Sequence, residues 1–371
     1  MTDNTYIKHH FDHWLLFTAI LLVGIGVTMN YSASAVLAQE RYADSYFFLK
    51  RTLIFIGLGG GVLIGALNFN YHHYKKMVYP LLLLSLCLGV MTMIPGLGRK
   101  VSGATRWISL YGFRFQPSEL IKLAMIIFLA YSLEKKTKHI RTLVIGILPN
   151  LIVMSVVALC ILAQRDLGSA FTIACITWLM MYVAGARLAY LLSFAVATMP
   201  IIFWLIAGSD YRKRRMLSFL NPWSDQYGAG FQMIQSYVAF NEGGFFGRGL
   251  GEGQQKLFYL PEAHTDFIFS VIGEELGLIG VLAVIALFSF FAYRGIKIAL
   301  NAPDLFGKYL ALGATSLISL SAILNMAVVM GLLPTKGLTL PFISYGGSSL
   351  IVSFLAVGIL LNISSFREVD A

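Results

Sequence analysis

Charged residues are scarce in this sequence. Asp, Glu, Lys and Arg make up 12% of the 371 residues, whereas hydrophobic residues make up 57%, and the mean hydropathy is +0.74. A soluble domain of this length carries far more charge on its surface. The composition therefore excludes a soluble globular protein and predicts a polytopic membrane protein.

Cysteine is also rare, and several familiar catalytic motifs are missing. Cys87, Cys160 and Cys175 each lie inside an apolar run, so their spacing indicates neither a metal site nor a disulfide. The sequence contains no zinc signature, Walker loop or nucleophile elbow. These absences argue against an ATP-driven machine, and we expect no nucleic-acid partner.

Long apolar segments account for most of the chain. A helix needs about 20 residues to cross a hydrocarbon core of about 30 Å. The segments that approach this length lie near 14–36, 52–68, 77–95, 117–134, 142–163, 167–185, 188–207, 267–293, 308–332 and 342–363. The sequence therefore predicts an all-α polytopic membrane protein with about ten transmembrane helices.

One long segment interrupts this apolar pattern. Residues 208–265 separate the seventh and eighth predicted helices. The sequence shows no internal repeat, low-complexity tract or soluble domain. We therefore expect residues 1–371 to form a single membrane domain with one long extracytoplasmic loop at 208–265.

The distribution of Lys and Arg predicts the orientation in the membrane. An even number of spans places both termini on the same side, and Lys and Arg are slightly more frequent in the short loops of that side. The positive-inside rule then places both termini in the cytoplasm. The excess is small because the outer face is also basic. An anionic ligand there, such as a phosphate, explains this charge, although Arg212–Arg215 serves equally well as an interface anchor.

Ionisable side chains gather just before the eighth apolar segment. They are Glu262, His264, Asp266, Glu274 and Glu275. Acids at a membrane interface are costly unless they are paired or hydrated, so they indicate a functional site. The alternative is a solvated helix start, capped by His264, Thr265 or Asp266, with Glu274 paired to a neighbouring helix.

Charged residues also occur where other predicted helices begin. Glu119 and Lys122 lie three residues apart on one face of the fourth helix, so they can pair. They form either a structural pair or the wall of a polar cavity near the outer leaflet. Asp166 places another carboxylate at headgroup depth, where the simpler expectation is that it caps the sixth helix.

Two outer loops combine a cation with Gly, Ser and Thr. They are Lys100–Trp107 and Leu333–Ser349. Irregular backbone at membrane depth is tolerated only against protein or a wet cavity, so we expect the second loop to dip inward. The outer half therefore suits a substrate with an isoprenoid or acyl tail and a phosphate-bearing head.

Several long motifs resemble those of one family of bacterial membrane proteins. The motifs are Gln-Pro-Ser-Glu at 116–119, Asn-Pro-Trp at 221–223 through Gln235, Lys256–Gly277, and Pro-Thr-Lys-Gly to Ser-Tyr-Gly-Gly-Ser-Ser at 334–349. They occur in order over nearly all of the chain. They are similar to the SEDS family (shape, elongation, division and sporulation), most of all to its division branch and then to its elongation branch.

This resemblance implies a peptidoglycan glycosyltransferase that polymerises lipid II into glycan strands outside the cytoplasmic membrane. It places the family's catalytic aspartate on Asp266, its fourth-helix pair on Glu119 and Lys122, its Arg before Trp on Arg106, and its turn aspartate on Asp166. It also implies a class B penicillin-binding protein as the transpeptidase partner, within the septal division complex.

The chemistry of glycosyl transfer agrees with these residues. A base must take a proton from the acceptor 4-hydroxyl, and such help is worth ~10²–10⁴ in rate, so we expect Asp266 to be the general base. Undecaprenyl pyrophosphate leaves and requires fixed cations. The candidates are Arg106, Lys122, Arg214, Arg215, Arg248 and Lys336. A lone base predicts inversion of the donor linkage. No metal-ligand set is evident, and a divalent cation at the diphosphate stays open.

Two other functions remain open from the sequence. The polar cavity of a lipid II flippase would also contain charges such as Glu119 and Lys122. The clustering of charges on one face and the lack of an inverted repeat speak against transport. A non-catalytic scaffold of the division machinery is the third possibility, and it predicts that a change at Asp266 has no effect on growth.

Overall fold

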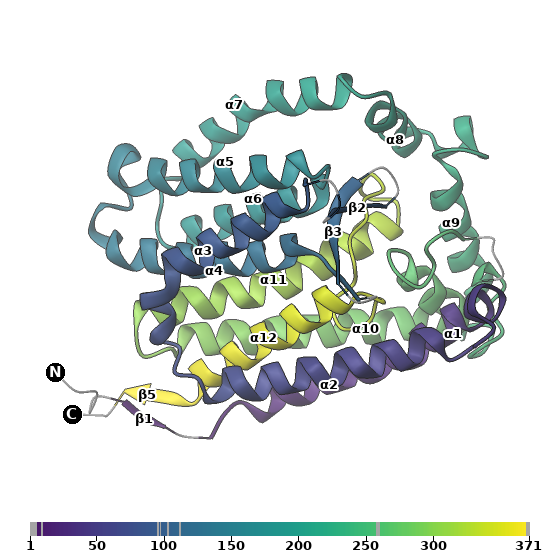
Figure 1. Ribbon diagram of the computed structural model, residues 1–371, viewed down its shortest axis with the longest axis horizontal. Coiled ribbons are helices and arrows are strands. Elements are labelled where there is room, and N and C mark those ends of the chain that lie inside the picture. Colours follow the sequence, from purple (N-terminus) through teal and green to yellow (C-terminus); the bar gives the residue numbers. More distant parts are fainter. Residues whose placement is uncertain are drawn as a thin grey trace.

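The computed structural model describes residues 6–8, 10–94, 96, 98–101, 104–110, 113–256 and 260–368. Long helices run along one axis and form a bundle (Figure 1). A helix lies in every range predicted from hydropathy. The bounds are α1 (His13–Tyr42), α2 (Phe47–Asn68), α3 (His73–Met91), α4 (Pro117–Lys135), α5 (Leu148–Ala163), α6 (Leu167–Val183), α7 (Leu188–Ala207), α10 (Ile268–Leu300), α11 (Leu305–Val329) and α12 (Gly347–Ser364). The predicted all-α membrane fold is confirmed.

The helices are not equally suited to cross a bilayer. Within the described ranges, seven helices are long and apolar enough to do so by length and composition. Helix α4 carries Glu119 and Lys122 near its start, and α6 is only 17 residues long. The seven helices define an integral membrane protein, and the number of about ten spans stays a prediction.

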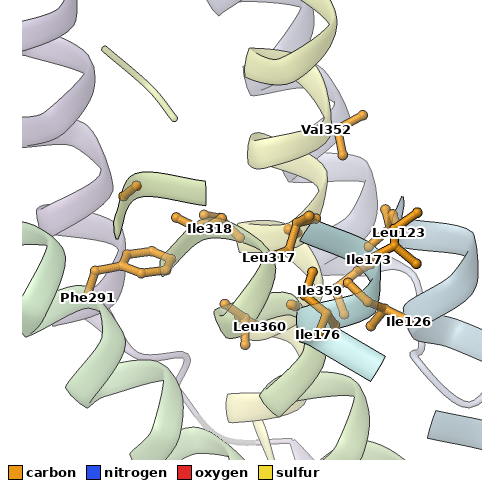
Figure 2. Close-up of a cluster of buried hydrophobic side chains, with 14 of the residues drawn as sticks. Leu123, Ile126, Ile173, Ile176, Phe291, Leu317, Ile318, Val352, Ile359 and Leu360 are labelled. Atoms are coloured by element: carbon orange, nitrogen blue, oxygen red, sulfur yellow. The ribbon is translucent and has the colours of Figure 1, made fainter. Parts of the chain in front are cut away.

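Helix α4 lies at the centre of the bundle. Its side chains from Ile121 to Ala130 are buried on every side, as expected for a helix that is apolar all round. Leu123 and Ile126 belong to one buried cluster with Ile173 of α6 and Ile359 of α12 (Figure 2). Burial of α4 between its neighbours fixes the polar residues at its first turn relative to α6 and α12.

Helix α12 approaches α2 closely because a glycine lies at the contact. A Cβ atom on Gly358 would lie 2.7 Å from the carbonyl oxygen of Leu63 and from the Cβ of Ala66, so no larger residue fits without a shift. Small residues allow the backbones of membrane helices to approach in this way.

Helix α10 is interrupted at Gly277, which has φ 65° and ψ −163°. This conformation favours glycine, and it frees carbonyl groups of the preceding turn. The backbone N–H groups of Arg248 and Gly249 donate to the carbonyls of Glu274 and Glu275 at 2.9 and 3.1 Å. The interruption thus anchors the segment that follows α9.

The insertion between α7 and α10 is structured. It contains α8 (Asp210–Leu220), the short helix η3 (Pro222–Asp225) and α9 (Phe231–Gly243). Two more short helical segments, η1 (Thr137–His139) and η2 (Leu143–Ile147), precede α5. Helices α7 and α8 arch over one side of the bundle (Figure 1). The extracytoplasmic location of residues 208–265 stays a prediction.

Two small sheets were not predicted from the sequence. Strands β2 (Gly98–Val101), β3 (Ala104–Leu110) and β4 (Phe113–Phe115) form an antiparallel sheet before α4. Strand β1 (Tyr6–Lys8) pairs with β5 (Phe366–Glu368), with Ile7 opposite Arg367. The two terminal segments therefore meet at one end of the bundle (Figure 1). The side of the membrane on which they lie stays a prediction.

The connection between α11 and α12 folds into the protein, as expected. Leu340 and Ile343 are buried, and the side-chain amide of Asn30 donates to the carbonyl of Ile343 at 3.4 Å. The predicted start of the last helix at residue 342 is wrong. Phe342 has φ 65°, which is incompatible with a helix, and α12 begins at Gly347.

Candidate active site

Asp266 lies at the end of the bundle opposite the paired terminal strands. It precedes α10, and the starts of α4, α6 and α12 face the same end. The interpretation of Asp266 as a helix cap is wrong, because the cap residue of α10 is Phe267 and no side chain bonds to the first turn. The carboxylate is therefore not engaged in capping.

Three hydrogen bonds hold the backbone around Asp266. Consecutive carbonyls accept hydrogen bonds from the α11–α12 region: His264 from the Tyr345 N–H at 2.9 Å, and Thr265 from the Ser344 hydroxyl at 2.5 Å. The Asp266 carbonyl accepts a bond from the Asn325 side-chain amide at 2.9 Å. The turn 262–267, which we call the aspartate turn, is thereby fixed without use of the Asp266 carboxylate.

The protein around the Asp266 carboxylate favours its neutral form. Burial, followed by the nearby charge of Glu262, raises the pKa of Asp266 to about 7, while Arg106 and Arg215 act in the opposite direction. Asp166 adds a smaller contribution that also raises the pKa. A carboxylate with this pKa exchanges protons near neutral pH, as a general base must.

Arg106 connects Asp266 with Asp166. The Arg106 Nη1 atom lies 3.8 Å from Asp166 Oδ1, and the Asp166 side chain is only 2% exposed. A Cβ atom on Gly337 would lie 3.2 Å from Asp266 Oδ2 and 3.6 Å from Arg106 Nη1. Gly337 therefore leaves open the space where the guanidinium and the Asp266 carboxylate converge.

Both oxygens of the Asp166 carboxylate accept hydrogen bonds. It caps α6, as predicted, by accepting the Ser169 N–H at 3.0 Å. Its other oxygen accepts from the side chains of Ser169, Gln116 and Ser118 at 2.9, 3.1 and 3.3 Å. These bonds hold the Asp166 carboxylate in a fixed orientation toward Arg106. By contrast, Arg106 Nε is buried and has no hydrogen-bond partner among the described residues.

Two more predicted cations contact or belong to the segment that precedes Gly337. Arg215 of α8 donates from Nη1 to the carbonyl of Thr335 at 3.2 Å. Lys336 places its ammonium 4.1 Å from the ring centroid of Phe171 in α6, and burial lowers the pKa of Lys336. Arg106 and Arg215, whose charges act on Asp266, form what we call the aspartate-side cations, whereas the Lys336 ammonium lies against the ring of Phe171.

Glu119 and Lys122 form a closed pair. Lys122 Nζ lies 2.8 Å from Glu119 Oε1, and both side chains are buried. Within the described ranges, no hydrogen bond or ion pair joins them to Asp266. The structural interpretation of this pair is therefore favoured over a cavity wall, because its charges already satisfy each other.

Glu274 and Glu275, in the stretch 256–277, are also satisfied. Lys256 Nζ lies 2.8 Å from Glu275 Oε1, and the Ser32 hydroxyl donates to the same carboxylate at 2.7 Å. Glu274 accepts the backbone N–H of Gln254 at 2.6 Å instead of pairing with a neighbouring helix, so that expectation is wrong. Asp266, in contrast to Glu274 and Glu275, lies with the aspartate-side cations.

Two predicted substrate-binding cations are not brought to Asp266. Arg248 pairs with Glu242 at 3.2 Å, and its backbone is bound to the interrupted part of α10. Arg214 is exposed on α8. We therefore remove Arg248 and Arg214 from the set that surrounds Asp266. Their spacing in the sequence carried no information on the direction of their side chains.

Sequence reasoning missed Asn325 and the polar partners of Asp166. Asn325 is a polar residue inside an apolar run, which is a signal that the sequence contained. Gln116 and Ser118 belong to a motif that was recognised, but their contact with Asp166 across 50 and 48 residues could not be seen. Across the described part of the chain, no group of three or more His, Cys, Asp or Glu is placed to hold a metal ion.

The fold and this site define an integral membrane protein with a titratable carboxylate and fixed cations at one end of a helical bundle. A family model described as "Cell cycle protein", covering FtsW, RodA and SpoVE, matches residues 12–369. The chain therefore belongs to the FtsW/RodA/SpoVE family, in agreement with the SEDS motifs.

The similarity to two relatives extends over nearly the whole chain. A protein named "Probable peptidoglycan glycosyltransferase FtsW" of Geobacter sulfurreducens is 50% identical over 355 residues, 96% of this chain and 95% of that protein. Stage V sporulation protein E of Bacillus subtilis is 44% identical over 357 residues, 96% of this chain and 98% of that protein.

Solved structures show the same fold. One belongs to a study described as "Structural coordination of polymerization and crosslinking by a peptidoglycan synthase complex", with TM-score 0.77 and 29% identity over 95% of this chain and 97% of that chain. The rod shape determining protein RodA of Thermus thermophilus has TM-score 0.68 and 26% identity over 95% of this chain and 96% of that chain.

Proposed function

We propose that this protein is a peptidoglycan glycosyltransferase that polymerises lipid II at the outer face of the cytoplasmic membrane. The observation that carries the proposal is the convergence of the Asp266 carboxylate and the Arg106 guanidinium in the space beside Gly337. The relatives that are named peptidoglycan glycosyltransferases, at 50% identity, support this function.

In the proposed reaction, Asp266 is the general base. It accepts the proton of the acceptor 4-hydroxyl while that oxygen bonds to the anomeric carbon of the donor. The bond from this carbon to the diphosphate breaks, and its electron pair leaves with undecaprenyl pyrophosphate. General-base help of this kind is worth ~10²–10⁴ in rate.

The surroundings of Asp266 favour inversion at the anomeric carbon. A retaining reaction needs a second carboxylate free to act as a nucleophile. Asp166 is engaged in hydrogen bonds with Ser169, Gln116 and Ser118, so it does not supply one. Glu262, whose charge also acts on Asp266, is exposed and accepts the Thr265 hydroxyl at 3.0 Å, so we do not assign it this role. A direct displacement therefore converts the donor's α linkage into a β linkage.

The aspartate-side cations would stabilise the leaving diphosphate. Arg106, oriented by Asp166 at 3.8 Å, offers a guanidinium whose Nε has no partner among the described residues. Fixed cations are most effective where charge develops in the transition state. Lys122, paired with Glu119, is not required for this role. A divalent cation, if used, would take most of its ligands from the diphosphate oxygens.

The relatives support a proposal for the partners and the location. We propose that the protein acts with a class B penicillin-binding protein in the division complex, at the septum, with both termini in the cytoplasm. The similarity to a chain of a peptidoglycan synthase complex supports a transpeptidase partner. Higher identity to proteins named FtsW than to RodA favours division over elongation.

A reconstituted assay tests this function against a lipid II flippase and a non-catalytic scaffold. Labelled lipid II is supplied to vesicles that contain the wild type or the Asp266→Asn variant, and both polymer and translocated lipid are scored. We expect polymer from the wild type and a loss of at least about 10²-fold in the variant. Translocation without polymer would identify a flippase, and the absence of both products would favour a scaffold.

A further inference from the structure

Helix α8 (Asp210–Leu220) carries four consecutive cations, Arg212–Arg215. It begins three residues after the apolar helix α7 ends, and it turns away from the direction of α7 (Figure 1). Its one acid, Asp210, lies in the first turn, where a negative charge suits the N-terminal end of a helix. The rest of α8 is therefore positively charged.

The cations of α8 point in different directions. Arg215 turns toward the active site, where its Nη1 donates to the carbonyl of Thr335 at 3.2 Å. Lys213 and Arg214 are exposed. Among the described residues, neither of these two side chains forms a hydrogen bond or an ion pair, not even with Asp210. Their charge is therefore available to a partner outside the chain.

Exposed apolar side chains lie beside Lys213 and Arg214. Leu217 follows them by four and three residues, and Leu220 comes three residues later, so these side chains share one face of the helix. Leu217 is 54% exposed and Leu220 is 70% exposed, whereas Ser218 is buried. Helix α8 thus rests on the protein with one side and presents a mixed basic and apolar face with the other.

Such a face is typical of an amphipathic helix that lies in a membrane interface. Long basic side chains can keep their charge among the headgroups while their stems lie along apolar surface. Trp223, in η3 directly after α8, is also exposed, and Trp is enriched at membrane interfaces.

The neighbouring helix indicates that lipid covers this face. Phe203 and Trp204, near the end of α7, are 74% and 72% exposed. Apolar side chains on a helix of a membrane protein face lipid unless another helix covers them. Since α8 starts six residues after Trp204, the lipid around α7 continues to the exposed face of α8.

We propose that α8 lies on the bilayer surface at the Asp266 end of the bundle and binds anionic phospholipid headgroups through Lys213 and Arg214. Leu217 and Leu220 then enter the boundary between headgroups and acyl chains. Arg215, on another side of the same helix, contacts the segment that leads to Gly337, so one helix joins the membrane surface to the active site. This interaction is separate from the proposed reaction on lipid II.

The test places a fluorescent bimane label on Leu217→Cys in the full-length protein. Cys87, Cys160 and Cys175 are replaced by alanine, and the protein is held in nanodiscs of equal amounts of phosphatidylcholine and phosphatidylglycerol. Quenching by lipids brominated at different acyl positions measures the depth of the label. We expect a depth of about 5–10 Å below the phosphate level.

The same label measures the preference for anionic lipid, as the ratio of quenching by brominated phosphatidylglycerol to that by brominated phosphatidylcholine. Each cation near an anionic surface contributes about fivefold, which corresponds to about 1 kcal/mol. Unaltered α8 cations should give a preference of about fivefold or more, and the double variant Lys213→Gln, Arg214→Gln less than about twofold. The preference should also fall in 1 M salt, where the screening length is about 3 Å.

Two further variants serve as controls. Lys213→Arg with Arg214→Lys keeps both charges and should keep the preference. Lys50→Gln removes an exposed cation at the same end of the bundle that already lies 2.8 Å from Asp44, so it should also keep the preference. Variants are compared only where their thermal midpoints agree.

Four results would overturn the inference. A label that no brominated lipid quenches would place the face of α8 in water or against a protein. Equal quenching by both lipids would exclude a preference for anionic headgroups, and a preference that survives in the double variant would exclude Lys213 and Arg214 as its cause. Loss of the preference when lipid II is added would assign the two cations to a substrate diphosphate instead.

Discussion

The side-chain amide of Asn325 donates a hydrogen bond to the backbone carbonyl of Asp266 at 2.9 Å. The same nitrogen donates to the carbonyl of Leu338 at 2.5 Å, and Asn325 is fully buried in α11. One amide therefore joins the aspartate turn to the segment that carries Lys336 and Gly337. We regard Asn325 as a positioning residue, since it acts on the reacting groups only through the backbone.

Replacement of Asn325 by Leu should lower kcat by more than the loss of folded protein explains. The change removes both donors, and a misplacement of about 1 Å can cost 10²-fold in rate, so we expect a loss of about 10- to 100-fold in kcat with little change in KM. The measurement is steady-state polymerisation of lipid II together with the thermal midpoint of the purified protein.

Asn150→Leu is the matched control for that variant. Asn150 is also fully buried, and it accepts the Ser132 hydroxyl at 2.6 Å near the other end of the bundle. It should lower the thermal midpoint to a similar extent while kcat stays near the wild-type value. An equal loss of kcat in both variants would show that Asn325 supports the fold only.

The rate should depend on pH through Asp266. Its pKa is raised to about 7, chiefly by burial, and the base form is the carboxylate. The rate of chemistry should therefore be constant well above pH 7 and fall about tenfold per pH unit below it. The check is a pH–rate profile of kcat/KM in the wild type. A profile that stays flat down to pH 5 would contradict the assignment of Asp266 as the base.

The same pKa shift predicts how the thermal stability of Asp266→Asn differs from that of the wild type at each pH. Because the folded state binds this proton more tightly than the unfolded state, the carboxylate makes stability fall as pH rises from about 4 to about 7. The neutral amide lacks this penalty, so the variant should melt at a higher temperature than the wild type at pH 8. The gain should shrink toward pH 5, and thermal unfolding at both pH values measures it.

The buried pair of Lys256 and Glu275 should be essential for stability. Their side chains are 6% and 0% exposed and lie 2.8 Å apart. Lys256→Met leaves a buried carboxylate without its partner, at a cost of about 3–5 kcal/mol. The double variant Lys256→Met, Glu275→Leu removes both charges and should lose less stability than the single one. Denaturation in detergent compares them, and a greater loss in the double variant would contradict this view.

Asp304, which precedes α11, should stabilise the far end of the bundle. Burial opposes its ionisation, but hydrogen bonds from His72 and the Gly307 N–H, with the charge of Lys75, lower the pKa of Asp304 to about 2. A lowered pKa contributes stability above about pH 4 that is lost as pH falls toward 2. Asp304→Asn should therefore cost about 2 kcal/mol at pH 7.

The effect of Asp304→Asn should be confined to stability. The residue lies at the end of the bundle opposite Asp266, so kcat should stay at the wild-type value. Asp44→Asn, which removes a more exposed partner of Lys50, is the control and should leave the thermal midpoint unchanged. A loss of activity in Asp304→Asn that exceeds the loss of folded protein would reveal a link between the two ends.

The sequence by itself determined the positions of the long helices and singled out Asp266. Apolar runs of spanning length fold into helices in lipid because backbone groups cannot bond to water there, so hydropathy alone located α1 to α7 and α10 to α12, but not α8 and α9. A carboxylate before such a run is too costly to be incidental, which drew attention to Asp266.

The tertiary structure alone decided which charges act together. Arg106 and Arg215 reach Asp266, whereas Arg248 turns to Glu242 and Lys122 to Glu119. A side chain's partner depends on the direction from which its element approaches and on contacts between distant segments, such as Asn325 with Asp266. The spacing of residues along the chain gives neither the direction of approach nor these long-range contacts, because the packing of the helices fixes them.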